Sequence, residues 1–381
     1  MQKYTQLAVV LGAFFSGSAL AANAVADARG NAMGNTGVTT SDYLLAPFYN
    51  PALTAVYRSR DDFGVLLPAV GINLRDSDDN LSTIDDLQDV IKAFEAGDTS
   101  QATRDRLNRY LDDLNNNKPF AVSGGLGVAV AIPMNRVSLN FFARGYVELL
   151  AKTDIAQVTA NTVEDIENRY NSSEVNIMAF GYSEYGIAVA KMVQYRGHQW
   201  AIGVAPKIQQ LKTYQQSLSV KEFDLDDYDQ SETSDSAFNL DLGVVWLKDN
   251  YRAGVVVKDL FSQKITTFNG INQYKLDTQV TVSGGYVTDA FTAAVDLDLT
   301  KQSRFDGKGD DTQFLRFGLE GNAWRWAQLR AGYEIDLESN LDNAITAGIG
   351  FSPFDVVRFD LAGNYAGKHQ MGVAANLSLT F

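Results

Sequence analysis

The chain has 381 residues, a formal net charge of −14 and no cysteine. This acidic balance argues against binding to nucleic acid, which needs clustered Lys and Arg. The lack of cysteine excludes disulfides, thiol chemistry and cysteine-based zinc sites. The chain contains 31 Gly and 17 Tyr but only 7 Pro, a balance that suits long β-ladders with tyrosines at a membrane interface.

The first residues are typical of an export signal. Lys3 supplies a positive charge, the apolar run Leu7–Phe15 follows, and Ala19-Leu20-Ala21 forms a cleavage site of the A-x-A type. Ala22-Asn23-Ala24 is a second candidate for cleavage. The apolar run is shorter than the roughly 18–20 residues that a membrane-spanning helix needs. We therefore expect residues 1–21 to be a cleaved signal peptide.

Residues 22–59 show little alternation of polar and apolar side chains, so we do not assign them to a wall of strands. The residues that we single out here are Gly30, Gly34, Gly37, Leu44, Phe48, Asn50 and Pro51. Glycines allow a chain to bend tightly against a wall. A free tail would leave the apolar side chains in water, although burying each is worth about 1.5–3 kcal/mol. We expect a plug or hatch inside a barrel; a periplasmic tail is the alternative.

Residues 82–117 have the periodicity of helices. Ile84, Leu87, Ile91 and Phe94 recur at three- and four-residue steps, and a similar pattern begins at Leu107. We therefore expect two helices in a long loop, residues 75–119. Their apolar stripe needs cover, which the mouth of a barrel would provide most simply.

Apolar and polar side chains then alternate with a period of two, as in strands whose two faces differ. The expected strands lie near 61–74, 120–133, 136–150, 176–194, 198–212, 237–247, 251–259, 278–287, 291–300, 313–321, 326–336, 343–352, 356–365 and 370–381. Short and long connections alternate between them, as in outer-membrane barrels. A soluble β-sandwich has no reason to segregate its loops. We therefore predict an all-β, antiparallel transmembrane barrel of about 14 strands over residues 60–381, with the helical loop as its first extracellular loop.

Four of the predicted strands each carry two charged residues on the same face, and both signs of charge occur. These residues are Asp296, Asp298, Arg316, Glu320, Arg330, Glu334, Arg358 and Asp360. Mixed signs on neighbouring strands predict a paired network that fills the lumen. An ion path along the same ladder is the alternative.

Nothing in the sequence favours catalysis, a metal or a cofactor. The two histidines, His198 and His369, are expected at opposite rims of the barrel. The acidic stretches Asp224–Asp229 and Asp306–Asp311 lack the spaced pattern of a calcium loop, so we interpret them as solvated loops. The chain ends on an alternating strand closed by Phe381. This end resembles the terminal signal that the outer-membrane assembly machinery recognises.

Residues 28–38 (ARGNAMGNTGV) and the later Asn50-Pro51-Ala52-Leu53 resemble the N-terminal segment of the FadL-type outer-membrane transporters. Within that group the sequence is most similar to the barrel family labelled conjugal transfer protein TraF, which is distinct from the thioredoxin-like protein of the same label. The resemblance implies a luminal plug at residues 22–58, an apolar extracellular pocket and a wall kink through which ligand leaves sideways. Gly145, on the third strand, is the candidate for that kink.

We therefore expect a bacterial outer-membrane protein that is not an enzyme. Its expected function is FadL-like passive transport of a small apolar molecule through a plugged barrel. The alternative is an envelope or surface assembly component of conjugative transfer that uses its barrel only as an anchor. The expected partners are outer-membrane lipid and lipopolysaccharide, the assembly machinery and a small hydrophobic ligand, but no nucleic acid.

Overall fold

The computed structural model describes residues 27–158, 162–223, 231–305, 310–323, 326–353 and 356–381. The expected signal peptide, residues 1–21, lies outside these ranges. Within them, no helix is long and apolar enough to cross a membrane.

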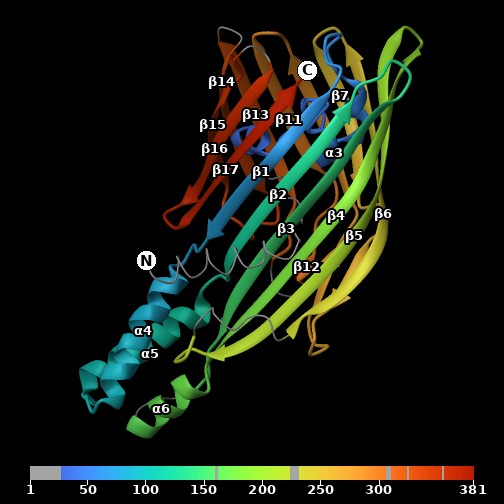
Figure 1. Ribbon diagram of the computed structural model, residues 1–381. Coiled ribbons are helices and arrows are strands. Elements are labelled where there is room, and N and C mark those ends of the chain that lie inside the picture. Colours follow the sequence, from blue (N-terminus) through green and yellow to red (C-terminus); the bar gives the residue numbers. More distant parts are fainter. Residues whose placement is uncertain (1–26, 159–161, 224–230, 306–309, 324–325, 354–355) are drawn as a thin grey trace.

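Fourteen antiparallel strands form one closed barrel, which confirms the predicted fold class (Figure 1). Its strands are β1 (Gly64–Arg75), β2 (Phe120–Ile132), β3 (Ser138–Asp154), β4 (Glu174–Tyr195), β5 (His198–Ser219), β6 (Thr233–Lys248), β7 (Tyr251–Lys258), β10 (Gln279–Val287), β11 (Phe291–Asp298), β13 (Phe314–Ala323), β14 (Ala327–Asp336), β15 (Ala344–Phe351), β16 (Val357–Gly367) and β17 (Gln370–Thr380). Each strand overlaps one predicted range. The last strand pairs with the first, so the sheet has no free edge.

The two faces of the wall have opposite character. On β13, Phe317 and Leu319 are 39% and 49% exposed, whereas Arg316 and Glu320 are 7% and 6% exposed. A soluble sandwich buries its apolar face, so this inside-out distribution excludes one and is typical of a barrel that meets lipid. Connections alternate as predicted, which defines a short-turn rim and a long-loop rim.

The long-loop rim carries structure that the sequence analysis treated as loop. β8 (Gln263–Thr266), β9 (Gln273–Leu276) and β12 (Arg304–Phe305) come from two different loops and form a three-stranded sheet. Tyr274 of this sheet stacks on Phe180 of β4, with ring centroids 3.5 Å apart, and contacts Phe305 edge-on. The sheet is therefore anchored to the barrel wall by aromatic side chains.

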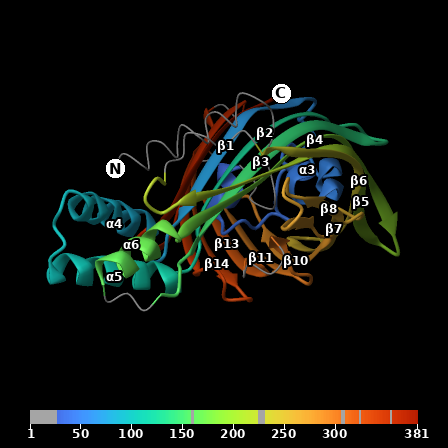
Figure 2. The same ribbon diagram turned by 90° about the horizontal axis from the view of Figure 1, so that it is seen from below.

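Three helices extend from the same rim: α4 (Asn80–Glu95), α5 (Gln101–Asn116) and α6 (Val163–Asn171). The first two were predicted, whereas α6 was not; it begins at a capping box between Thr162 and Asp165. Their apolar stripes pack against one another as well as against wall strands at the long-loop rim, so the expected cover by the barrel mouth is one part of what buries them. Leu87, Leu111 and Tyr170 are fully buried in one cluster formed by the helices and nearby strand ends. Both views place the helices to one side of the barrel opening (Figures 1 and 2).

Candidate luminal site

Residues 27–57, here called the luminal segment, lie within the barrel. They include α2 (Ala28–Ala32), α3 (Ala46–Tyr49) and the 3₁₀ helix η1 (Pro51–Ala55). Every residue from Asp27 to Ala55 is buried except the half-buried Asn35 and Asp42. Both ribbon views show this segment surrounded by strands (Figures 1 and 2).

Tyr49 explains two of the three glycines that the sequence analysis singled out in this segment. A Cβ on Gly37 would lie 2.3 Å from the Tyr49 ring, and one on Gly30 would lie 1.5 Å from its hydroxyl oxygen. That hydroxyl donates to Asp27 over 3.0 Å. The tyrosine therefore closes the segment on itself, and only glycine fits beneath it.

The inner wall contacts this segment through glycines, which we call the glycine belt. At each of them a Cβ would approach an atom of the luminal segment closer than 3.0 Å: Gly64, Gly203, Gly243, Gly254, Gly285, Gly318, Gly332 and Gly348. Eight different strands contribute one glycine each. The closest backbone contact joins Gly332 to Gly34, whose amide nitrogen lies 2.2 Å from the Cβ position. Gly34 also has a φ of +64°, which favours glycine.

Asn50 and Pro51 fix the turn between α3 and η1. The Asn50 Oδ1 accepts from the backbone of Ala52 over 3.1 Å, and its Nδ2 donates to the Val38 carbonyl over 3.0 Å. Pro51 occupies the start of η1, where a missing N–H costs no hydrogen bond. Leu44 and Phe48 of the same segment pack in an apolar cluster with inward-facing residues of β1–β5.

The eight charged residues predicted for the lumen all lie on the inner face. Arg316 pairs with Asp298 and Glu334 over 3.0 and 3.2 Å, and Arg330 pairs with Glu320 and Asp360, each over 2.6 Å. The remaining contacts reach the luminal segment. Glu320 accepts from Arg29 over 3.1 Å, Arg358 pairs with Asp42 over 2.8 Å, and Asp296 accepts the amides of Gly37 and Val38. The network therefore fastens the segment to β11–β16.

A second buried network, on β3–β7, was not found from the sequence. Lys207 lies 3.2, 2.9 and 2.8 Å from carboxylates of Glu184, Asp241 and Asp259. Lys258 donates to the Phe48 carbonyl over 2.7 Å. These charged residues stand at inward positions of their strands, and this was the feature from which the network could have been suspected. The sequence gives no means of knowing that three carboxylates from distant segments meet Lys207.

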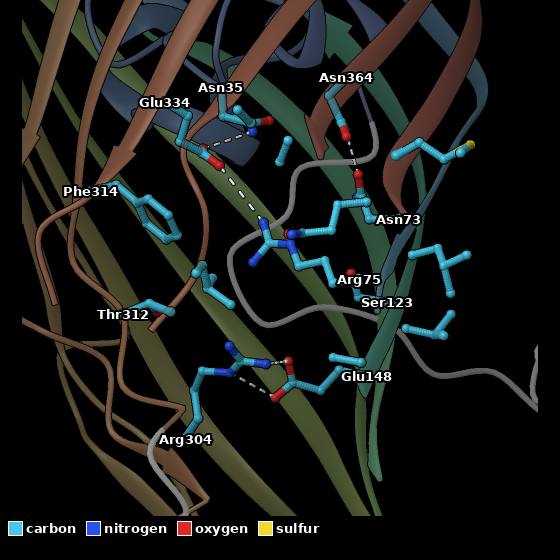
Figure 3. Close-up of a pocket in the computed structure, with 18 of the residues that line it drawn as sticks. Asn35, Asn73, Arg75, Ser123, Glu148, Arg304, Thr312, Phe314, Glu334 and Asn364 are labelled. Atoms are coloured by element: carbon cyan, nitrogen blue, oxygen red, sulfur yellow. Dashed lines mark hydrogen bonds and ion pairs between the residues drawn. The ribbon is translucent and has the colours of Figure 1, made fainter. Parts of the chain in front are cut away.

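A chamber of about 100 Å³ separates the luminal segment from the three-stranded sheet (Figure 3). Its inner end is Asn35, which donates to Glu334 over 3.0 Å, and its outer end is Arg304, which pairs with Glu148 of β3. The side wall carries Arg75, 3.9 Å from Glu334. The other lining side chains are mostly apolar or aromatic, among them Leu74, Tyr146, Tyr274, Phe314 and Met371. The chamber therefore offers both polar groups and ring faces.

The structure places no break in the wall at Gly145. Both ladders of β3 pass through this glycine, opposite Leu126 and Ser183, without a shift of register. A shift occurs instead in β1, between Leu66 and Val70 on the β17 side and between Leu66 and Ala69 on the β2 side. Pro68 explains it, because a proline has no N–H for the ladder.

The other residues considered from the sequence lie away from the chamber. Phe381 closes the barrel, because its backbone N–H donates to the Phe63 carbonyl over 2.8 Å. His198 and His369 lie at turns on opposite rims. The stretch Asp224–Asp229 lies outside the described residues, and of Asp306–Asp311 only the last two residues are described. Asp311 pairs with Lys301 over 2.6 Å.

Comparisons with known proteins agree with this architecture. The family model described as "F plasmid transfer operon, TraF, protein" matches residues 47–298. No curated protein matches the chain significantly. Among solved structures, the toluene transporter TbuX of Ralstonia pickettii is 11% identical with a TM-score of 0.54, over 93% of this chain and 98% of TbuX. CymD, a monoaromatic hydrocarbon channel, is 11% identical with a TM-score of 0.55, over 93% of this chain and 97% of CymD.

A deltaS2 mutant of the monoaromatic hydrocarbon channel TodX is 12% identical with a TM-score of 0.54, over 93% of this chain and 98% of that one. At such identities the likeness shows the fold alone, and that fold confirms the expected resemblance to FadL-type barrels. The family match covers well over half of the chain. The chain therefore belongs to the TraF protein family of the F plasmid transfer operon and has the fold of a FadL-type barrel.

Proposed function

We propose that this chain is an outer-membrane channel for passive uptake of a small, largely apolar molecule, with the luminal segment as its plug. The proposal rests on the chamber between the plug and the three-stranded sheet, where the rings of Tyr146, Tyr274 and Phe314 lie among aliphatic and polar side chains. The similar solved structures support it, since their titles describe a toluene transporter and monoaromatic hydrocarbon channels.

The proposed orientation follows from the two rims. Outer-membrane barrels keep short turns in the periplasm and long loops outside the cell. The start of β1 and the C-terminal Phe381 then lie on the periplasmic side. The helices α4–α6 and the three-stranded sheet lie outside, and the apolar outer wall faces lipid and lipopolysaccharide.

The proposed route follows the apolar side of the lumen. Leu44 and Phe48 of the plug share one buried cluster with Leu66 of β1. Leu66 borders the break in the ladders, where Leu67 and Pro68 face outward. The opposite side of the plug is fixed by charge pairs, which an apolar molecule would have to disrupt at high cost. Ligand would therefore leave the chamber along β1 and pass sideways at this break rather than at Gly145.

A second candidate is an envelope component of conjugative transfer that uses the barrel as an anchor. The family assignment and the tight packing of the plug favour it. In that case the helices α4–α6, which lie beside the opening, would be the surface that meets other proteins. The two functions differ in whether anything crosses the wall.

Uptake of radiolabelled toluene by cells that lack other hydrocarbon channels distinguishes them. Ser123→Trp would fill the chamber, whereas Val130→Trp on the same strand faces outward and is the matched control. We expect uptake above the vector level in the wild type and in V130W, and a loss of at least fivefold in S123W. Uptake at the vector level in the wild type would favour the anchor.

A further inference from the structure

A second cavity, of about 260 Å³, opens beneath the luminal segment at the short-turn rim. Three wall residues face this cavity: Arg252 of β7, Arg358 of β16 and Ser378 of β17. Asp42 of the luminal segment and Arg58, which directly follows that segment, also line it. It lies at the opposite end of the lumen from the chamber, which is lined by none of these residues. It is therefore a separate place.

The charges around this cavity do not cancel. Arg358 pairs with Asp42 over 2.8 Å, and Arg58 pairs with Asp61 over 2.8 Å. Both carboxylates are thus already engaged. Arg252 has no carboxylate within 4.0 Å among the described residues, and its Nη1 donates only to the Thr39 carbonyl, over 3.1 Å. One guanidinium charge is left over, in a protein whose net charge is −14.

Arg252 retains hydrogen-bonding capacity as well as charge. A guanidinium carries five N–H groups, and one contact in the described part of the chain uses only a part of them. Ser378, directly across the sheet from Arg358, has a hydroxyl for which the described residues provide no partner. Arg252 and Ser378 can therefore both donate further hydrogen bonds into the cavity, which suits an acceptor with a negative charge.

We propose that this cavity binds a small organic carboxylate. Its charge would balance Arg252, and the two carboxylate oxygens match the fork of a guanidinium better than a single-atom anion does. The volume is many times the roughly 10–15 Å³ that one water needs. Val56, Tyr57 and Val357 line the remaining wall and would receive an apolar body. A ring of the size of benzoate meets these requirements.

A carboxylate held there would also act on the plug. The wall residue Arg252 contacts Thr39 of the luminal segment, and Arg358 contacts Asp42 of the same segment. An anion between them would relieve the uncompensated charge beneath the plug and so stabilise the plugged state. The site faces the periplasm in the proposed orientation, and it does not depend on what the chamber admits.

Isothermal titration of the full-length, detergent-solubilised protein with benzoate tests the proposal, because it requires no transport. We expect one site per chain and binding weakened at least tenfold in Arg252→Gln, which keeps a donor for Thr39 but removes the charge. Arg252→Lys, which keeps the charge but loses the fork, should be intermediate. Arg196→Gln, in the exposed β4–β5 turn of the same rim, removes an equal charge and should bind like the wild type. Heat-modifiable migration on gels reports that each variant is folded.

Benzyl alcohol and inorganic phosphate complete the design. We expect neither to compete with benzoate at tenfold higher concentration. Equal binding of benzyl alcohol would mean an apolar hollow with no role for the charge, and equal binding of phosphate would overturn the assignment to organic carboxylates. No benzoate binding to the wild type at 20 mM, or equal losses in R252Q and R196Q, would also overturn the site. If R252Q alone fails to fold, Ser378→Val takes its place. Wild-type affinity for benzoate in both Ser378→Val and Arg252→Lys would then contradict the proposal.

Discussion

The glycine belt makes a sharp prediction about the plug. Replacing Gly332 by Ala would place a Cβ 2.2 Å from the Gly34 amide nitrogen and 2.3 Å from the Met33 carbonyl carbon. Both neighbours are backbone atoms, so no side-chain rotation can relieve the contact. Overpacking of this kind typically costs about 1–3 kcal/mol. We expect the variant to retain a closed barrel, because strand pairing is untouched, but to displace the luminal segment from β14.

Gly321→Ala is the matched control. Gly321 lies on the neighbouring strand β13, and a Cβ there would meet no atom within 4 Å. The assay is limited proteolysis of purified protein with cleavage mapped in residues 27–57, alongside permeation of small sugars into liposomes. Gly332→Ala should be cut faster and leak more than Gly321→Ala. Equal protection and equal permeability of the two variants would refute the claim that these glycines exist to seat the plug.

Three further predictions concern the wall, one loop and the orientation. Leu361→Arg, on the lipid face of β16, should lower the free energy of unfolding by roughly 2–4 kcal/mol in denaturant titrations in lipid. Asn364→Arg, on the inner face of the same strand, should lower it by less. The reverse order would contradict the assignment of the inner and outer faces. Burial raises the pKa of the Asp310 carboxyl to about 6. Its folded pKa thus exceeds the unfolded value, so its protonated form stabilises the three-stranded sheet at low pH and this contribution is lost as the pH rises from about 4 through 6. The protection factors of the β12 amides, which correct for the intrinsic rise of exchange with pH, should fall over that range, and Asp310→Asn should abolish this fall. A cysteine at Asp98 should react with an impermeant maleimide on intact cells and one at Asp249 should not; equal labelling would contradict the proposed orientation.

Period-two alternation was sufficient to predict all fourteen wall strands, because each residue of a barrel wall faces either lipid or lumen. In β13, for example, Leu315, Phe317 and Leu319 alternate with inward residues such as Arg316 and Glu320. The same reasoning placed eight charged residues on the inner face. It did not give their partners, since Arg29 and Glu320 are separated by 291 residues.

Features that depend on contacts between distant segments could not be read from local patterns. The strands of the three-stranded sheet have as few as two residues, too short to show alternation. The inward glycines were visible, but their common purpose appears only when residues 32–52 lie against them. Gly145 was chosen for a kink because glycines weaken strands, yet Pro68 disrupts the ladders because it has no N–H to donate.

We propose that residues 27–57 plug a barrel that admits small apolar molecules. Deleting Ala28–Pro47 removes the contacts to the glycine belt on β7–β15 but leaves Asn50-Pro51 and every strand intact. The decisive measurement compares this deletion with the wild type and a vector control in one strain, for toluene uptake and for leakage of small polar solutes. We predict a folded, heat-modifiable barrel that leaks polar solutes and loses selective toluene uptake. A deletion that neither leaks nor changes uptake would contradict both the plug and the transport function.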